Sequence, residues 1–491
     1  MTRRGHGHVY VYIWFDIEDY VTLESDDLPL VALAILNKYD VKATCKMVAE
    51  KVRELLEHGR TDVISAISHH DVGYHTDTHS KHPTAYEYMA NLDILEGSQK
   101  FASVEKNGLK LVENVFQRKM SCFGHAGPAW TAHYYPALEK MGIPVYLDET
   151  KILNLNDRPY WYCGVLNLNG ANRNFIRFDY TYEDPSGLVR LKKEFKTIHD
   201  RVQKKGWGTI SLLFHLHTAI NREYWDAVNF ANGRNTPKES YVRPKPQSKE
   251  VTQRAWNDFE ELVKYMKSFH DVQFIAATDA SKIFGSKKEI VLDRSLIKRI
   301  PEKLGTRIKY LKAGNDSFLS PAEIFYFVTK CLDEYSRTGK RPTKVRILPE
   351  PLGPESLMRS RIKGRKIKTA ELFEAAGGVL VYFDTKNRIP SFIKLDGGDL
   401  SPEDFLATGS KILKLIIKGS KLPDKISVVG GRFVNSKFVD QLEFRKACRW
   451  IILPRGFKAP NIFRQIVLQT WTLKPALPQV AATREKSRLG S

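Results

Sequence analysis

Two histidines four residues apart, His75 and His79, lie in the segment GYHTDTHSKHPT. Imidazoles at this spacing can point at one ion from a helical turn or a tight loop, although such a pair alone is a weak signal. A second segment, FDIEDY, supplies three carboxylates, those of Asp16, Glu18 and Asp19. Two histidines and one carboxylate leave positions on a zinc ion open for water and substrate, as a hydrolytic site requires. Another carboxylate could serve as general base, and a separate histidine as general acid.

The elements that would position these residues alternate along the first part of the chain. Short apolar runs rich in β-formers alternate with helical patterns up to about residue 280. The expected strands cover 9–15, 41–48, 71–75, 120–124, 144–148, 209–217 and 272–278. This alternation predicts an α/β fold with a parallel sheet, and seven strands favour a closed barrel over an open sheet.

The carboxyl ends of the expected strands select the candidate site. In parallel α/β folds the working residues lie at these ends. The rule points to the acidic segment, to the histidine pair and to four further residues, which are His125, Asp148, His215 and His217.

Length and cysteine content limit the class of protein. At usual domain sizes, 491 residues make two or three domains. The five cysteines are scattered and form no C-x-x-C pair, which argues against a disulfide framework and favours a reducing compartment. No apolar run is long enough for a signal-peptide core or a membrane span, so we expect a cytoplasmic location, with cell-wall association as the open alternative.

The basic character of the chain belongs to its C-terminal part. Residues 1–284 carry equal numbers of basic and acidic side chains, so the net charge of +21 comes entirely from residues 285–491. The Lys- and Arg-rich stretch 285–316 is predicted to be a basic linker. A polar tail is expected over 481–491.

Residues 317–480 are predicted to form an α+β domain that contains repeats. Three similar stretches, at about 320–348, 368–395 and 401–428, each combine a helical pattern, a proline and a short β-rich run. Two of them begin with Leu-Ser-Pro, where Ser320 or Ser401 can cap a helix and Glu323 completes a capping box in the first.

Three motifs of the first part resemble those of the polysaccharide deacetylases, the fourth family of carbohydrate esterases. HHDVGYHTDTH is similar to that family's second motif, WFDIEDY to its first and TISLLFHLH to its last. The resemblance covers about residues 9–284 and implies a distorted (β/α) barrel of seven or eight strands. It implies hydrolysis of an N-acetyl or O-acetyl group on an amino sugar or glycan, with a divalent metal. Zinc is expected first, with cobalt, nickel or manganese as alternatives.

The resemblance also implies roles for single residues. Asp16 corresponds to the catalytic base, and His75 and His79 to metal ligands. The third ligand would be Asp19 or Glu18, with a slight preference for Asp19.

The last motif and the third motif bear on the acid and on the base. His215 corresponds to the general acid, with His217 as second choice. In the third motif the stretch FGHAGPAW has Gly124 where the family has an arginine that orients the base, and Ala126 where it has a proline. His125 or another basic residue would have to replace that arginine.

Four residues are candidates for substrate binding. They are His125, Trp130, Asp148 and Trp225. Aromatic faces can stack on pyranose rings, but packing in the core is an equally good interpretation of Trp130, and capping of a helix is an equally good interpretation of Asp148. Trp225 lies in a long stretch, 220–247, that follows the His215 strand and is interpreted as a substrate-binding lid.

The C-terminal repeats leave three functions open. They resemble pseudomurein-binding repeats of archaea, which would imply attachment to cell-wall glycan and an archaeal source. The surplus positive charge suggests nucleic-acid binding as a weaker alternative. A structural or dimerising domain is the third. For the whole chain, the alternatives to a deacetylase are an amidohydrolase for a small amide and a non-catalytic protein that binds glycan or nucleic acid.

Overall fold

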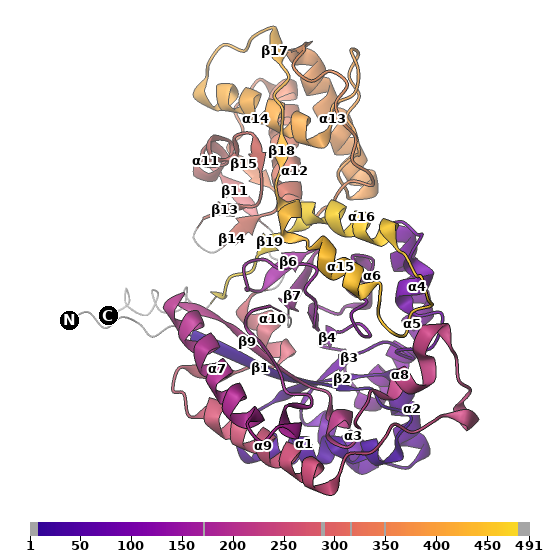
Figure 1. Cartoon of the computed structure of the whole chain (residues 1–491). Helices are drawn as coiled ribbons and strands as arrows, with labels where there is room; N and C mark the ends of the chain where they lie inside the picture. Colours follow the sequence, from indigo (N-terminus) through magenta and orange to yellow (C-terminus); the bar gives the residue numbers. More distant parts are fainter. Residues whose placement is uncertain (1–7, 170–171, 286–289, 315–316, 348–349, 480–491) are drawn as a thin grey trace, which may run out of the picture. The chain divides into compact units, whose positions relative to one another are not determined.

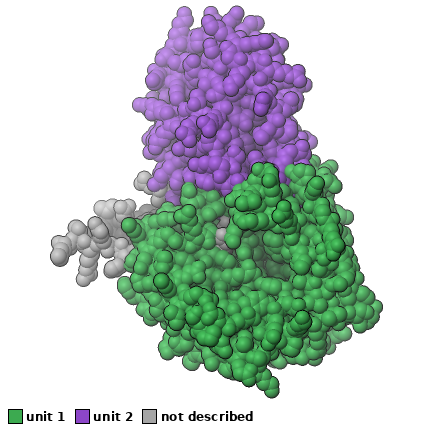
Figure 2. Space-filling model, viewed as in Figure 1, with its two compact units in different colours: residues 1–159, 167–283, 440–460 green, residues 160–166, 284–439, 461–491 purple. Residues whose placement is uncertain are grey.

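The computed structural model describes residues 8–169, 172–285, 290–314, 317–347 and 350–479. The chain divides into two compact units (Figure 2). Unit 1 consists of residues 1–159, 167–283 and 440–460, and unit 2 of residues 160–166, 284–439 and 461–491.

A buried central strand, β1 (His8–Ile17), organises unit 1. Its residues from Val9 to Ile17 are all buried. Strands β2 (Ala43–Met47), β9 (Trp207–Phe214) and β10 (Val272–Phe274) all pair with it in parallel. A continuous apolar run of this kind is typical of a parallel strand whose two faces are both covered.

The parallel sheet of unit 1 is a curled half-barrel (Figure 1). The remaining strands are β3 (Asp71–Tyr74), β4 (Cys122–Phe123), β5 (Val145–Asp148) and β8 (Phe175–Arg177), and the order is β5-β4-β3-β2-β1-β9-β8. The α/β class and the seven expected strands are confirmed. The curled sheet is consistent with the expected distorted barrel, although no pairing among the described residues joins the two ends of this order, as a fully closed barrel would require.

Helices cover the outer side of this sheet (Figure 1). Those of unit 1 are α1 (Leu28–Lys38), α2 (Ala49–Glu57), α3 (Thr61–Ser68), α4 (Ala85–Met89), α5 (Ile94–Phe116), α6 (Tyr134–Met141), α7 (Gly187–Lys204), α8 (Trp225–Phe230), α9 (Lys249–Lys267) and α10 (Ala277–Ile283). In α7 the buried residues Leu191, Phe195, Ile198 and Val202 recur at helical spacing, so this helix packs one apolar stripe on β9 and β1.

A segment distant in sequence completes unit 1. Residues 440–460, which include α15 (Gln441–Ala447), belong to this unit although the sequence placed them in the C-terminal domain. The amides of Asn232 and Gly233 donate to the carbonyls of Ile451 and Ile452 at 2.8 and 3.0 Å. Hydrogen bonds across more than 200 positions could not be inferred from local patterns.

The stretch expected to be a basic linker is folded within unit 2. It forms β11 (Val291–Asp293), α11 (Arg294–Leu304), β12 (Arg307–Ile308) and β13 (Leu311–Ala313). The linker interpretation is therefore wrong for residues 290–314. Ile297, Ile300 and Leu304 lie on one face of α11 and are buried, and this spacing was visible in the sequence.

Three longer helices of unit 2 occupy the three predicted repeats. They are α12 (Pro321–Thr338), α13 (Thr369–Lys386) and α14 (Pro402–Lys418). The predicted capping box of Ser320 and Glu323 is confirmed, and Ser401 caps α14. Short strands follow two of the helices, β15 (Lys344–Arg346) and β17 (Lys425–Ser427), whereas no such strand follows α13 in the described residues. The tail 481–491 lies outside the described residues.

The remaining elements are short. They are β6 (Tyr160–Tyr162), β7 (Val165–Asn169), β14 (Ser317–Leu319), β16 (Lys366–Lys368), β18 (Arg432–Phe433), α16 (Pro460–Gln469) and β19 (Lys474–Pro475). Among the described residues, no helix has both the length and the apolar character needed to cross a membrane.

Glu105 of α5 is a buried acid whose ionisation should affect stability. It accepts hydrogen bonds from the Tyr74 hydroxyl at 2.6 Å and from the Asp77 amide at 2.7 Å. Burial raises its pKa from 4.5 to about 7. Because the unfolded chain loses this proton at lower pH than the folded chain, we expect the free energy of unfolding to fall by about 3 kcal/mol between pH 4.5 and 7.

Urea unfolding of the wild type and of Glu105→Gln at pH 5 and pH 8 measures this contribution. The variant should lose less stability than the wild type between the two pH values. An equal loss in both proteins would show that Glu105 ionises normally in the folded state.

Candidate metal centre

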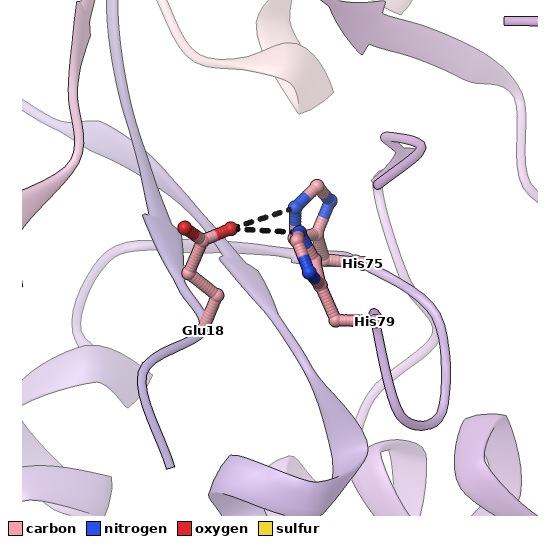
Figure 3. A group of neighbouring side chains, drawn as sticks. All are labelled: Glu18, His75 and His79. Carbon is pink, nitrogen blue, oxygen red and sulfur yellow. Dashed lines mark hydrogen bonds and ion pairs between the residues drawn. The ribbon is translucent and has the colours of Figure 1, made fainter. Parts of the chain in front are cut away.

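Three buried side chains converge at the carboxyl ends of β1 and β3 (Figure 3). Glu18 follows β1, and His75 and His79 follow β3. Glu18 Oε2 lies 3.3 Å from Nε2 of His75 and 3.0 Å from Nε2 of His79. The predicted histidine pair and one member of the acidic segment therefore face one point.

Hydrogen bonds at the other ring nitrogens fix the tautomers of the two histidines. Nδ1 of His75 lies 3.1 Å from the carbonyl oxygen of Gly124, which can only accept. Nδ1 of His79 lies 2.7 Å from Oγ of Ser80, and that hydroxyl donates to Asp226 at 2.7 Å. Both imidazoles therefore carry their hydrogen on Nδ1 and direct a lone pair from Nε2 towards Glu18.

This donor set fits a divalent cation. Two imidazole nitrogens that each lie within 3.3 Å of one carboxylate oxygen, with all three atoms within 4.8 Å of one another, repel unless a proton or a cation lies between them. Burial works to raise the pKa of Glu18, but with a proton on His79 the contacts with His79, His217 and His75 hold that pKa well below its usual range, so a proton lies in this group until a cation replaces it. An ionised carboxylate and two neutral imidazoles are ligands that zinc prefers.

Asp19 is not part of this group. Its Oδ1 accepts the amides of Val21 and Thr22, each at 3.0 Å, and its Oδ2 accepts from the Asn221 side chain at 3.2 Å. Asp19 thus stabilises the turn after β1, and the carboxylate that faces the two histidines is Glu18, not the slightly preferred Asp19.

The loop between the two histidines has an unusual backbone. Thr76 and His79 have positive φ values of 70° and 56°. A β-branched residue rarely adopts this conformation, which costs about 1–3 kcal/mol. The Thr76 hydroxyl accepts the amide of His79 at 3.1 Å and so stabilises the turn that brings the second histidine back.

Asp16, the expected base, is paired with a buried lysine. Its Oδ1 lies 2.9 Å from Nζ of Lys46, which is directly opposite on β2. Its Oδ2 lies 3.4 Å from Nε2 of His215. Burial works to raise the pKa of Asp16, but His75, Lys46 and His215 hold it below its usual range.

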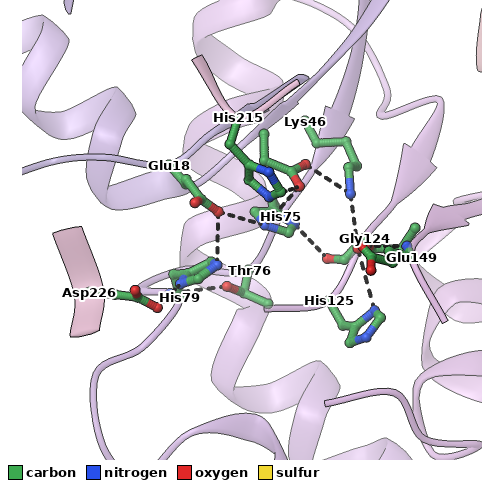
Figure 4. Close-up of polar contacts among 12 residues, drawn as sticks. Glu18, Lys46, His75, Thr76, His79, Gly124, His125, Glu149, His215 and Asp226 are labelled. Atoms are coloured by element: carbon green, nitrogen blue, oxygen red, sulfur yellow. Dashed lines mark hydrogen bonds and ion pairs between the residues drawn. The ribbon is translucent and has the colours of Figure 1, made fainter. Parts of the chain in front are cut away.

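Lys46 occupies the space beside Gly124 (Figure 4). A Cβ atom at position 124 would lie 2.2 Å from Nζ of Lys46 and 2.3 Å from Oδ2 of Asp148. The lysine has no exposed side-chain surface and pairs with Asp148 at 2.9 Å as well as with Asp16. The basic residue near Asp16 is therefore Lys46, whereas His125 lies beside Asp148 at 3.4 Å and hydrogen-bonds Tyr146.

His215, the expected acid, is oriented by Asp179. Nδ1 of His215 lies 2.7 Å from Oδ2 of Asp179, and the backbone amide of His215 donates to Oδ1 of the same residue at 2.8 Å. Burial lowers the pKa of His215, but Asp179 and Asp16 raise it well above its usual value. The Nε2 atom can therefore carry a proton that faces Asp16.

His217 lies on the other side of Glu18. Its Nε2 is 3.2 Å from Oε1 of Glu18, the oxygen that does not face the histidine pair. Neither ring nitrogen of His217 makes a hydrogen bond within the described part of the chain. Its contact is with Glu18, whereas His215 contacts Asp16.

The two expected substrate-binding tryptophans are core residues. Trp130 and Trp225 have no exposed surface. The indole N–H of Trp130 donates to the hydroxyl of Tyr135, and that of Trp225 donates to Oε1 of Glu18 at 3.3 Å. Trp225 also packs against Tyr20, so it is a core residue that contacts the candidate metal centre through Glu18.

Sequence patterns missed four residues of this region, which are Lys46, Asp179, Asp226 and Trp450. Lys46 interrupts a buried strand, and a charge in such a strand is a signal that could have been used. Asp179 lies in a turn, Asp226 in the short helix α8 and Trp450 in the distant segment 440–460, and no long periodic pattern indicates their position.

No protein-family model matches this chain, and no curated protein sequence matches it. Solved structures similar to it include a protein assigned as a polysaccharide deacetylase from Mycobacterium smegmatis, at 15% identity over 57% of this chain and 92% of that one, with a TM-score of 0.36. An allantoinase shares 11% identity over 57% and 91%, with a TM-score of 0.38. A polysaccharide deacetylase assigned in Pseudomonas aeruginosa PAO1 shares 10% identity over 56% and 90%, with a TM-score of 0.37. At these identities and TM-scores, none of the three decides the activity or substrate of this chain.

Proposed function

We propose that this protein is a metal-dependent hydrolase that removes an N-acetyl or O-acetyl group from an amino sugar or glycan. The observation that carries the proposal is the convergence of Glu18 with the lone pairs of His75 and His79. An acid–base pair, Asp16 and His215, lies beside that group with 3.4 Å between its facing atoms.

Glu18, His75 and His79 would hold the cation, with zinc as the first expectation. When bound, such a cation polarises the substrate carbonyl and lowers the pKa of water. Ser80 with Asp226 and the carbonyl of Gly124 keep the ligand nitrogens in the binding tautomer.

Asp16 and His215 divide the proton transfers. Asp16, kept ionised by Lys46, accepts the proton of the attacking water. His215, held by Asp179, gives the proton on Nε2 to the departing amine or alcohol. The low exposure of both residues, 4% for Asp16 and 8% for His215, keeps bulk water from competing in these transfers.

Product analysis after zinc loading tests the proposed function. Wild-type protein should release acetate from N-acetylated chito-oligosaccharides, and Asp16→Asn should be about 10²–10⁴-fold slower while keeping its zinc. Release of ammonia or formate from small amides, without acetate from sugars, would instead assign a small-amide hydrolase. If the protein forms no product from either substrate class, with or without zinc, the enzyme proposal is wrong.

A matched pair of variants tests the third ligand. Glu18→Gln should weaken zinc binding by about tenfold or more, because a neutral amide replaces the ionised ligand. Asp19→Asn should leave zinc affinity nearly unchanged, because its contacts are hydrogen bonds within the turn. Competition with a chromogenic chelator measures both affinities, and the reverse order would assign Asp19.

For unit 2 we propose attachment to glycan, in keeping with its basic sequence and with the resemblance of its repeats. Binding of the full chain to insoluble cell-wall glycan, resistant to added nucleic acid, would support this role. Salt-dependent binding to nucleic acid, without binding to glycan, would instead favour a nucleic-acid-binding role for unit 2.

A further inference from the structure

A pocket of about 340 Å³ adjoins the candidate metal centre on the side of His79. The loop after β3, helix α5 and the stretch around Ala126 and Ala129 line it. Neither Glu18 nor His75 lines it, so the pocket is a separate compartment that shares only the edge of the metal group. Its volume is at the lower end of the range for small-molecule sites.

The distant segment 440–460 supplies one wall of this pocket, Trp450. The indole of Trp450 is half-buried, and its ring centroid lies 6.3 Å from that of His79. It lies against Gly127, where an added Cβ would be 2.4 Å from Cε2 of Trp450. Ile452 anchors the segment in an apolar cluster with Tyr20 and Trp225. The indole is therefore fixed in place beside the metal group.

The rest of the lining combines aromatic rings with a hydroxyl that has no hydrogen-bond partner among the described residues. Tyr86 and Tyr134 also contribute to the pocket. The hydroxyl of Tyr88 is buried and makes no hydrogen bond with any described residue. A buried hydroxyl without a partner costs about 1–3 kcal/mol, so a ligand or a water that bonds to it is favoured.

We propose that this pocket binds a second sugar ring of an oligosaccharide, next to the acetylated ring that reaches the metal group. An indole, apolar side chains and a hydroxyl that has no partner among the described residues suit a pyranose, which has apolar C–H faces and a rim of hydroxyls. The two lysines of the lining, Lys81 and Lys100, are exposed and can reach hydroxyls at the rim. This inference rests on the proposed function, because it assigns a subsite of the same centre.

Binding and turnover of a sugar series test the subsite. With zinc-loaded Asp16→Asn, calorimetry should show chitotriose binding about tenfold or more tighter than N-acetylglucosamine. Adding Trp450→Ala should remove that difference and leave monosaccharide affinity unchanged. In the protein with intact Asp16, Trp450→Ala should raise KM for the trisaccharide about tenfold with little change in kcat.

Two further variants keep the test independent of folding. Val104→Phe narrows the pocket from an exposed position on α5 and should reproduce the effect of Trp450→Ala. Trp207→Ala removes a half-buried tryptophan from the amino end of β9, away from the strand ends that hold the site, and should leave the sugar series unchanged. Equal effects of Trp450→Ala on mono- and trisaccharide would overturn the subsite. If neither the wild type nor any variant releases acetate, but chitotriose still binds more tightly than N-acetylglucosamine through Trp450, the hydrolase proposal fails and the sugar-binding pocket stands.

Discussion

Replacing His75 by alanine is expected to weaken zinc binding by about 100-fold or more and to bring hydrolysis below detection. His75 supplies one of two imidazole lone pairs that face Glu18, and its Nδ1 is held by the carbonyl of Gly124. Removing it leaves two ligands, which bind a divalent cation poorly. Zinc content after dialysis, together with acetate release, measures both effects.

His69→Ala provides a matched control, because it removes another histidine just before strand β3. His69 is exposed, and its Nδ1 contacts only the carbonyl oxygen of Ser65 in the same helix turn. This variant should keep both zinc and activity. Full zinc occupancy in His75→Ala would contradict the ligand assignment, whatever the activity.

Replacing Lys46 by methionine is expected to destabilise the fold and to slow hydrolysis. Lys46 has no exposed side-chain surface and lies 2.9 Å from both Asp16 and Asp148. Removing one partner of a buried ion pair costs about 3–5 kcal/mol, because the remaining charges are left without compensation. We expect this loss in urea unfolding, a kcat about 10²-fold lower, and unchanged zinc content.

A second substitution separates positioning from general destabilisation. Gly124→Arg alone should be harmful, because even its Cβ would approach Nζ of Lys46 to 2.2 Å. In the Lys46→Ala background the contact with Nζ is removed, and once Oδ2 of Asp148, 2.3 Å from the new Cβ, has turned aside, the guanidinium can pair with Asp16 and Asp148. The double variant should therefore exceed the additive expectation by about 1–3 kcal/mol in stability and recover part of kcat. Strict additivity would show that the two positions do not share one cationic site.

Strand and helix positions could be predicted from local patterns with few errors. The continuous apolar run of β1 and the helix cap at Ser320 depend on neighbouring residues only, so the sequence contains the information. The rule that places working residues at the carboxyl ends of parallel strands selected Asp16, His75 and His215, and the structure brings these three side chains together. Whether the sheet closes into a full barrel could not be predicted in this way, because closure depends on pairing between strands far apart in the chain, and no such pairing joins the ends of the sheet in the described residues.

Roles of single side chains were predicted less well where burial decides them. Trp130 and Trp225 have the residue type of sugar platforms, yet both lie in the core. Residue type does not indicate which face of a loop or helix meets the core, so the packing of the surrounding elements had to be known.

The sequence by itself determined that two histidines and a carboxylate segment would meet at one end of a parallel sheet. Only the tertiary structure decided which carboxylate faces the histidines, because Glu18 and Asp19 are adjacent and their directions depend on the turn after β1. It also decided that Lys46 fills the space beside Gly124 and that Trp450 borders the pocket. These contacts join residues up to several hundred positions apart, and their energies arise from burial and charge pairing in the folded chain.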